Sequence, residues 1–263
     1  MMRALLEQLI DTGPYQFEID TQPTDSLNQL ALDDGPDVLA LSVAHYPYVA
    51  ANYQLLPHGG SMGEGYGPVV ISNVPMEIAQ LQGKRIAVPG LTTSACATLR
   101  MMMDFQPEVV SISPYTRVFE ILKSGDVDAG LIIHEGRLTF SELGFHKVID
   151  LGEWWAEETD GLPLPLGANA IKRSLGETTI IEVSELLRQS IAHGLAHRDE
   201  AISWLLSHGG PLNTVQKTSD YLNMYANQRT LNYGPKGRLA IQQFLNRAAT
   251  LDLVPQVDVD YSP

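Results

Sequence analysis

Between residues 67 and 151 the sequence alternates between short apolar runs and segments with helical spacing, and this rhythm constrains the fold more than any other feature. The apolar runs are "GPVVIS" (67–72), "KRIAVPG" (84–90), "EVVSIS" (108–113), "AGLIIHE" (129–135) and "KVIDL" (147–151). Helical spacing is found in the intervening segments 93–103 and 116–125. Strands that alternate with helices predict α/β architecture with largely parallel sheets.

The segments on either side extend this pattern. Before residue 67 we expect a helix at 4–10, a strand at 15–19 ("YQFEI"), a helix at 26–32 capped by Thr24, Asp25 or Ser26, a buried strand at 37–43 and a helical turn at 44–51. After residue 151, "GLPLPLGANAIKRSL" (161–175) has prolines at alternate positions, which predict an extended crossing segment. Helical spacing then covers 179–195, 199–207, 212–226 and 235–250.

This order of segments predicts two lobes. Residues 1–79 and 167–263 form the first lobe, which the C-terminal helices close, and residues 80–166 form the second. A chain that crosses twice between lobes leaves a cleft, which is a common place for a small ligand. Hinge closure is the motion that such a layout allows.

Composition narrows the class of protein. The net charge of -14, from 31 acidic and 17 basic residues, repels nucleic acid and anionic membranes. A small anionic substrate stays possible, because a pocket can be locally cationic in an acidic protein. No run approaches the roughly 20 apolar residues of a membrane span, and the start of the chain does not have the pattern of a signal peptide. Cys96, the one cysteine, rules out an internal disulfide and thiolate metal sites. We therefore expect a cytoplasmic protein, and the oligomeric state stays open.

Two segments place hydroxyl groups where a ligand can bind. "LTTSACATL" (91–99) follows a predicted strand, so Thr92, Thr93 and Ser94 offer hydroxyls and free N–H groups to an anion at a helix N-terminus. An ordinary helix cap is the alternative. Ser42 ends another predicted strand, and ligands of open α/β sheets lie beyond such strand ends. A local turn hydrogen bond explains Ser42 equally simply.

Two other segments have ordinary explanations. The glycines of "HGGSMGEGYGPVV" (58–70) precede a strand, whereas a dinucleotide-binding loop follows a strand and opens a helix, so we reject that reading in favour of a hinge, pocket or surface loop. Trp154 and Trp155 either wall an aromatic substrate or fill the interface between the lobes.

The stretch "LIIHEGRL" (131–138) ends an apolar run in titratable residues. Because side chains alternate along a strand, we expect His134 and Glu135 to face opposite ways, with His134 toward the cleft and Glu135 structural. A neutral imidazole suits a general base, although a histidine at a strand end is often structural. His193 and His197 share a helix face without a metal-binding motif around them, and we interpret them as surface residues.

Taken together, these segments resemble a known family. "LSVAHYPYVAANYQLL", "GGSMGEGYGPVV", "AGLIIHEGRLTF", "DLGEWW" and "GLPLPLGAN" occur in this order and are similar to the 1,4-dihydroxy-6-naphthoate synthases of the futalosine route to menaquinone. The resemblance runs over nearly the whole chain, and LIIHE and GLPLPLG are its most specific parts. It implies a two-lobed fold of the periplasmic-binding-protein type II and a carbon–carbon lyase that acts on cyclic dehypoxanthine futalosine without a cofactor or metal.

The resemblance also assigns roles to residues. It implies that His134 is the general base, and that Ser42, Thr93, Ser94 and Ala95 hold the carboxylate or hydroxyls of the substrate. The two specific motifs add further substrate-binding residues, which are Ile133, Pro165 and Leu166.

The sequence departs from the family pattern at its N-terminus. Members of the family begin with a strand and a loop rich in Ser, Pro and Asx, whereas this chain begins at the helix that follows them, so we expect the sequence to lack an inner strand of its first sheet.

Chorismate dehydratases and transport-type solute-binding proteins share the fold. Neither carries the histidine stretch together with GLPLPLG, and a solute-binding protein for an aromatic carboxylate would bind without turnover.

Overall fold

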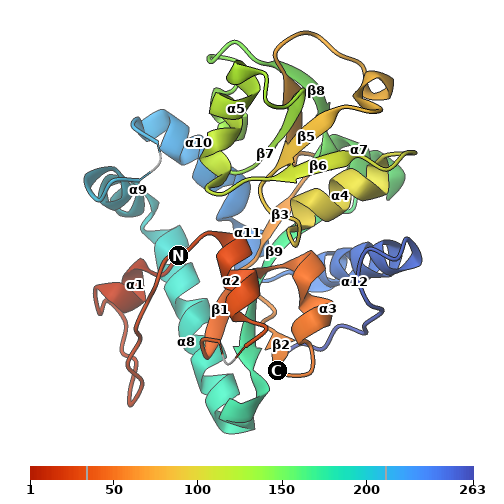
Figure 1. The fold of residues 1–263 in the computed structure, drawn as a ribbon. Coiled ribbons are helices and arrows are strands. Elements are labelled where there is room, and N and C mark those ends of the chain that lie inside the picture. Colours follow the sequence, from red (N-terminus) through yellow and green to blue (C-terminus); the bar gives the residue numbers. More distant parts are fainter. Residues whose placement is uncertain (34, 211) are drawn as a thin grey trace.

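The protein is built around two β-sheets, one in each half of the molecule. A computed structural model describes residues 1–33, 35–210 and 212–263. Figure 1 shows the first sheet in the lower half with α2, α3 and α8, and the second sheet in the upper half with α4, α5 and α7. The expected two-lobed α/β architecture is confirmed.

The first sheet is organised around a single long strand. Its members are β1 (Val38–Ser42), β2 (Tyr53–Leu55), β3 (Ser61–Gly63) and β9 (Leu164–Lys172). β9 pairs antiparallel with each of the other three, and its proline-rich start is the crossing segment expected from the sequence. The pairing of Ser42 with Gly167 brings the end of β1 beside the GLPLPLG stretch.

The second sheet has the strand order β6-β5-β7-β4-β8. Its members are β4 (Val69–Ser72), β5 (Arg85–Val88), β6 (Glu108–Ser111), β7 (Ala129–Ile132) and β8 (His146–Asp150). β5 pairs parallel with β6 and β7, whereas β4 pairs antiparallel with β7 and β8. The expectation of largely parallel sheets was therefore wrong. The two strands that the chain enters after crossing between the halves, β4 and β9, both pair antiparallel with their neighbours. β4 belongs to this sheet although it precedes residue 80, and the lobe boundaries stay a prediction.

Helices cover both sheets, and most lie where helical spacing predicted them. The α-helices are α1 (Arg3–Leu6), α2 (Thr24–Leu30), α3 (Tyr46–Val49), α4 (Ser94–Met102), α5 (Val118–Ser124), α6 (Gly136–Thr139), α7 (Leu151–Glu158), α8 (Glu177–Ala196), α9 (Arg198–Ser207), α10 (Val215–Tyr225), α11 (Gln228–Leu231) and α12 (Gly234–Thr250). Short 3-10 turns precede or join them at Val43–His45, Ile78–Leu81, Tyr115–Arg117 and Arg173–Leu175. Sequence spacing missed α6, α7 and α11.

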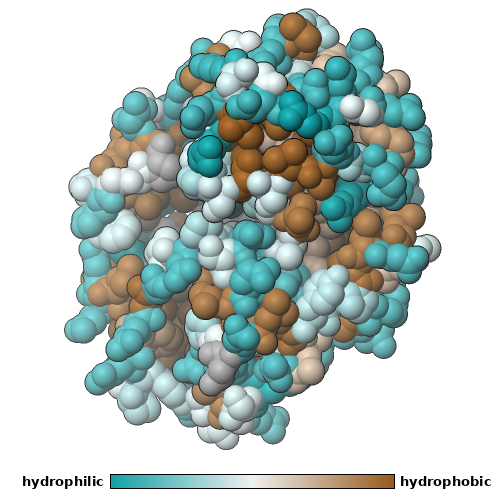
Figure 2. Space-filling view, viewed as in Figure 1, coloured by the Kyte–Doolittle hydropathy of each residue, from teal (hydrophilic) through white to brown (hydrophobic). Residues whose placement is uncertain are grey.

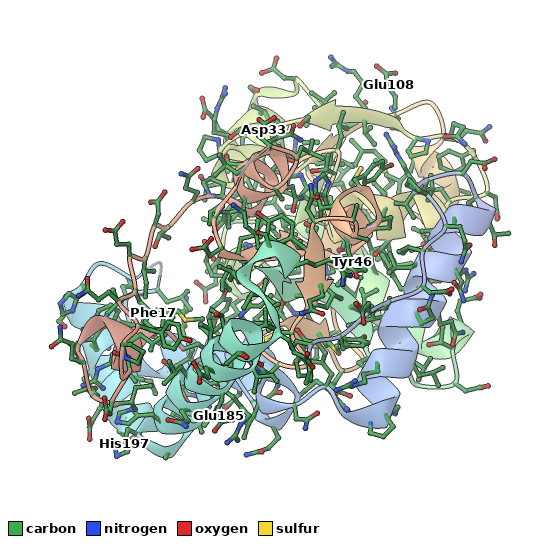
Figure 3. All side chains as sticks on the ribbon, turned by 90° about the horizontal axis from the view of Figure 1, so that it is seen from below. Phe17, Asp33, Tyr46, Glu108, Glu185 and His197 are labelled. Atoms are coloured by element: carbon green, nitrogen blue, oxygen red, sulfur yellow. The ribbon has the colours of Figure 1, made fainter. Side chains whose placement is uncertain are left out.

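The N-terminal segment differs from the prediction. Residues 15–19 form no strand; instead Tyr15 and Phe17 pack against a small apolar cluster beneath α8 that includes Leu5 and Ile180. Figure 3 shows Phe17 at the α8 side of the molecule, whereas Tyr46 lies within its body. α2 begins after Pro23 without a side-chain cap, so the caps expected from Thr24, Asp25 or Ser26 are not made.

The largest apolar core is continuous between the two sheets. It contains Leu41 and Ala168 from the first sheet together with Val88 and Leu131 from the second. Figure 2 shows that the surface seen in Figure 1 is mixed, with hydrophobic atoms gathered in the upper half over β6 and α4. No helix in residues 1–33, 35–210 and 212–263 has the length and apolar character of a membrane span.

The two tryptophans differ in their surroundings. Trp155 is fully buried, packs against Phe244 and donates a hydrogen bond of 3.1 Å from Nε1 to the carbonyl oxygen of Pro163. Trp154 lies beside it, half-buried, with the Arg247 guanidinium 5.0 Å from its ring centre. Trp155 therefore fills the interior, as one of the two interpretations proposed, and anchors the start of β9.

We expect Trp155→Ala to lower the free energy of unfolding by about 3–5 kcal/mol, because it leaves a large cavity in the core. The matched control is Trp154→Ala, which removes a half-buried ring and should cost far less. Denaturant unfolding of both variants measures the difference. Equal losses for the two would contradict the anchoring role of Trp155.

Candidate active site

His134 lies two residues beyond the end of β7, in a turn. The strand ends at Ile132, and His134 has a left-handed backbone with φ of 52°. This conformation costs a non-glycine residue roughly 1–2 kcal/mol, and such costs cluster at functional sites. In this turn the imidazole lies next to two tyrosines from other parts of the chain.

Those tyrosines contact the imidazole, which is partly buried. The Tyr221 hydroxyl from α10 lies 3.5 Å from His134 Nδ1, and the Tyr115 ring meets the imidazole edge to face with centres 5.3 Å apart. Burial lowers the pKa of His134 below its usual value, and the nearby Glu135 carboxylate offsets this only in part. The ring is therefore neutral at pH 7 and able to accept a proton.

Glu135 belongs to the same cluster, which corrects a sequence-based expectation. Its Oε1 accepts a hydrogen bond of 2.5 Å from the Tyr115 hydroxyl, and Tyr115 in turn contacts His134. Strand alternation predicted that His134 and Glu135 face opposite ways, but that rule does not apply because the strand has already ended at Ile132. Burial and the Glu135 hydrogen bond raise the pKa of Tyr115, so its hydroxyl keeps its proton.

An ion pair stabilises the turn that contains His134. Arg137, three residues after His134, pairs with the buried carboxylate of Asp150 and donates a hydrogen bond of 2.7 Å to the carbonyl oxygen of Gly67. Its guanidinium also lies 5.4 Å from the ring centre of Tyr66. The arginine thereby links the turn to β8 and to the chain entering β4, which fixes the position of His134.

A hydrogen-bonded group centred on Asn28 joins the two halves of the molecule. Asn28 is fully buried; its Oδ1 accepts from the N–H of Ser42 at 2.9 Å, and its Nδ2 donates to Ser42 Oγ at 3.2 Å and Thr92 Oγ1 at 3.0 Å. Thr92 also donates from its hydroxyl to Asp25 Oδ1 at 2.8 Å. Ser42 and the threonine-rich turn are therefore brought together, through a residue that sequence reasoning missed.

The turn before α4 uses its hydroxyls in two ways. Thr93 caps the helix: its Oγ1 accepts from the N–H of Cys96 at 3.2 Å and donates to the carbonyl oxygen of Gly90 at 2.8 Å. Ser94 Oγ accepts from the N–H of Ala44 at 3.1 Å, a second link between the halves. Gly90 has φ of 119°, and an added Cβ would lie 2.3 Å from Asp25, so glycine is required there.

The remaining predicted residues lie at the edge of the continuous core. Ala95 is part of that core, while Ile133 and Leu166 are partly buried against it. Pro165 is buried and pairs in register with Met62 of β3. Ala95, Ile133 and Leu166 thus belong to one apolar core, and a common cavity for all the predicted site residues stays a prediction.

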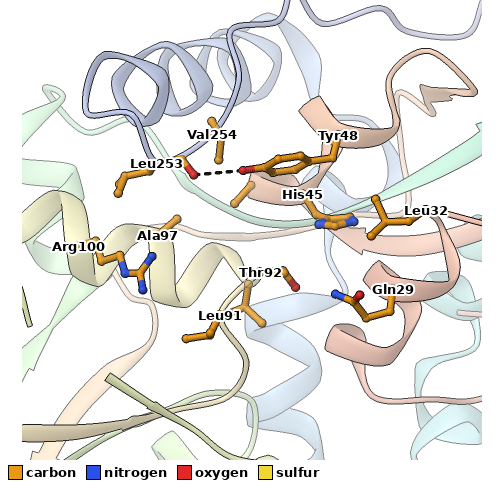
Figure 4. A pocket seen from close by; sticks show the side chains of 12 residues that line it. Gln29, Leu32, His45, Tyr48, Leu91, Thr92, Ala97, Arg100, Leu253 and Val254 are labelled. Atoms are coloured by element: carbon orange, nitrogen blue, oxygen red, sulfur yellow. Dashed lines mark hydrogen bonds between the residues drawn. The ribbon is translucent and has the colours of Figure 1, made fainter. Parts of the chain in front are cut away.

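A separate cavity of about 270 Å³ lies beside the turn before α4 (Figure 4). Thr93 lines it, together with His45 and Tyr48 from the other half of the molecule and Arg100 from α4. His134, Ser42 and Ser94 are not among its lining residues. Across the described residues there is no cluster of three or more His, Cys, Asp or Glu side chains that could hold a metal.

The sequence matches a family model over residues 1–250, and the model is described as menaquinone biosynthesis. The chain belongs to this family. Among curated relatives, the chain is 37% identical to a 1,4-dihydroxy-6-naphthoate synthase from Thermus thermophilus, over 90% of the chain and 85% of that protein. It is 35% identical to a protein of the same name from Streptomyces coelicolor, over 94% of the chain and 88% of that protein.

Solved structures agree on the fold. A protein from Archaeoglobus fulgidus superposes with a TM-score of 0.90 at 33% identity, over 96% of this chain and 93% of that one. The alkanesulfonate-binding protein SsuA from Xanthomonas axonopodis pv. citri superposes with a TM-score of 0.63 at 17% identity, over 89% and 81% of the two chains. The second likeness shows that this chain has the fold of a periplasmic binding protein.

We expect Asn28→Ala to lower the free energy of unfolding by about 1–3 kcal/mol, because it leaves the Ser42 N–H and other buried polar groups unpaired. Gln29→Ala, an exposed neighbour on the same helix, is the matched control and should be nearly neutral. Thermal or urea unfolding compares the two variants. A neutral Asn28→Ala would mean that the network contributes nothing to stability.

Proposed function

We propose that this chain is a lyase that forms 1,4-dihydroxy-6-naphthoate from cyclic dehypoxanthine futalosine, with His134 as the general base. The observation that carries the proposal is a neutral, partly buried histidine in the turn after β7, in a chain whose curated relatives are named for this synthase. The similarity supports the overall reaction, and the geometry supports the residue. The cytoplasmic location expected from the sequence stays part of the proposal.

The surroundings of His134 determine which of its nitrogens reacts. Nδ1 lies 3.5 Å from the Tyr221 hydroxyl, and we assign the ring proton to Nδ1, which donates to the tyrosine oxygen, so that the unprotonated Nε2 takes the proton from the substrate. The Tyr115 ring restrains the orientation of the imidazole, and the Glu135 carboxylate stabilises the imidazolium that forms. This arrangement needs no bound cofactor to move a proton.

The polar turn before α4 is the proposed anchor for the substrate. Within the described residues, the hydroxyls of Ser42 and Ser94 accept hydrogen bonds and retain a proton that they can donate. The first N–H groups of a helix have no partner within it. In α4, the N–H of Cys96 donates to Thr93 Oγ1 and the N–H of Ala97 donates to the carbonyl oxygen of Thr93. The N–H groups of Ser94 and Ala95 are thus the candidate donors to a substrate carboxylate. Ile133, Pro165 and Leu166 form the proposed apolar wall.

The deciding experiment is turnover. The protein is incubated with cyclic dehypoxanthine futalosine, and 1,4-dihydroxy-6-naphthoate is followed by chromatography and mass spectrometry. Product formed in proportion to enzyme supports the proposal. Saturable binding of the substrate with no product would instead identify a binding protein.

We expect His134→Asn to lower kcat by about 10²–10⁴-fold, because it keeps a polar side chain but removes the basic nitrogen. Substrate affinity and melting temperature should change much less. Tyr221→Phe keeps the ring and removes only the hydroxyl, so it should cost about 2- to 10-fold. A His134→Asn variant with nearly normal kcat would exclude His134 as the base.

The pH profile tests the same residue independently. The protonated imidazole cannot accept a proton, so kcat/KM should fall as the pH drops through the pKa of His134, at a value below the usual 6.5. Because the Glu135 carboxylate raises that pKa, Glu135→Gln should move the midpoint to lower pH. A midpoint above 6.5, or one that Glu135→Gln leaves in place, would contradict this account.

A further inference from the structure

The cavity beside α4 has walls from both halves of the molecule. The first half contributes Gln29 and Leu32 from α2 and its C-terminal end, with Ala44, His45 and Tyr48. The second half contributes the turn Leu91–Thr93 with Ala97 and Arg100 of α4, and Leu253 and Val254 close the cavity after α12. Its volume of about 270 Å³ is slightly below the roughly 300–1,000 Å³ of sites for drug-sized ligands, which suits a smaller molecule. Figure 4 shows Arg100 and His45 on opposite sides of Ala97.

His45 is the feature that requires explanation. It is only 2% exposed, yet within residues 1–33, 35–210 and 212–263 neither ring nitrogen makes a hydrogen bond of normal length and angle; the Asn28 backbone lies near the ring without satisfying it. Burial lowers its pKa, and the nearby Asn28 backbone and Asp25 carboxylate offset this only in part, so the ring is neutral at pH 7 and has one N–H donor and one acceptor nitrogen. Buried polar groups nearly always have a partner. A hydroxyl group, which both donates and accepts, is the ligand group that matches this ring.

Arg100 provides the second polar contact. Its guanidinium lines the cavity and makes no ion pair or hydrogen bond with any other residue that the structure describes. Arginine binds carboxylates in a planar, two-pronged geometry. The nearby carboxylate of Asp25 accepts a hydrogen bond from the Thr92 hydroxyl and is not among the lining residues.

The rest of the cavity is apolar and open at its rim. Leu32, Tyr48 and Leu91 line it and are 48%, 52% and 50% exposed, which is unusual for large apolar side chains lying together. The Tyr48 ring lies 5.5 Å from the His45 ring, centre to centre. These groups form a surface for a flat apolar body between the arginine and the histidine.

We propose that this cavity is a second small-molecule site, separate from the His134 site, for a single-ring aromatic carboxylate that carries a hydroxyl. The carboxylate binds Arg100, the hydroxyl binds His45, and the ring lies against Leu91 and Tyr48. The site adjoins the turn before α4 because both share Thr93. It does not depend on the reaction proposed above.

Isothermal titration with three probes tests the site: 4-hydroxybenzoate, benzoate and phenol. We expect 4-hydroxybenzoate to bind most tightly, benzoate several-fold more weakly because it lacks the hydroxyl, and phenol about tenfold more weakly because it lacks the charge. Equal affinities for 4-hydroxybenzoate and phenol would overturn the role of Arg100. No saturable binding of 4-hydroxybenzoate would overturn the site.

Variants locate the bound probe. Arg100→Gln should weaken 4-hydroxybenzoate about tenfold, and Ala97→Leu, which fills the cavity, should abolish its binding. Arg117→Gln makes the same charge change at an exposed position elsewhere and should leave affinity unchanged. His134→Asn should also leave it unchanged. Loss of binding in His134→Asn, or normal binding in both Arg100→Gln and Ala97→Leu, would place the probe elsewhere and overturn the proposal; melting curves establish that each variant is folded.

Discussion

The antiparallel pairing of β9 is the interaction on which the rest of the architecture depends. This strand holds β1, β2 and β3 together, and it is also the segment by which the chain returns from the second sheet. A strand that must serve both purposes has little freedom of position. The hydrogen bond from Trp155 to the Pro163 carbonyl oxygen holds the residue just before β9 in place. The pairing of Gly167 with Ser42 sets the register of β9 against β1. The location of Ser42 follows from that register.

Much of the second half could be predicted from the sequence because its signals are local. Buried apolar runs ending in turn residues located β4, β5 and β7, and helical spacing located α4 and α5. Strand direction could not be predicted in this way, since an apolar run has the same composition in a parallel and an antiparallel sheet. The strand expected at 15–19 failed for a related reason: alternation describes a segment that could pair, and here Tyr15 and Phe17 pack beneath α8 instead.

The proposed site was predictable only in part. His134, Ser42 and Ser94 stand at the ends of apolar runs or at a helix start, where sequence reasoning looks for ligands. Tyr221 is 87 residues from His134 in the sequence, and no local pattern connects the two. The sequence signal for Asn28 is weaker: it is a polar residue close to two leucines, Leu27 and Leu30, on a short helix. A search for polar residues at buried helix positions could have found it. Glu135 was misplaced because the strand ended earlier than its composition suggested.

The continuous apolar core has a consequence for how the two halves move. In a hinged protein whose halves have separate cores, each half could unfold or rotate on its own. Here Leu41 and Ala168 share one cluster with Val88 and Leu131, so separating the halves would expose apolar surface from both. Opening by a large angle is therefore costly, and the halves should lose their structure in a single cooperative transition. The distance between the histidine turn and the start of α4 is accordingly held by the interior, with little contribution from the surface.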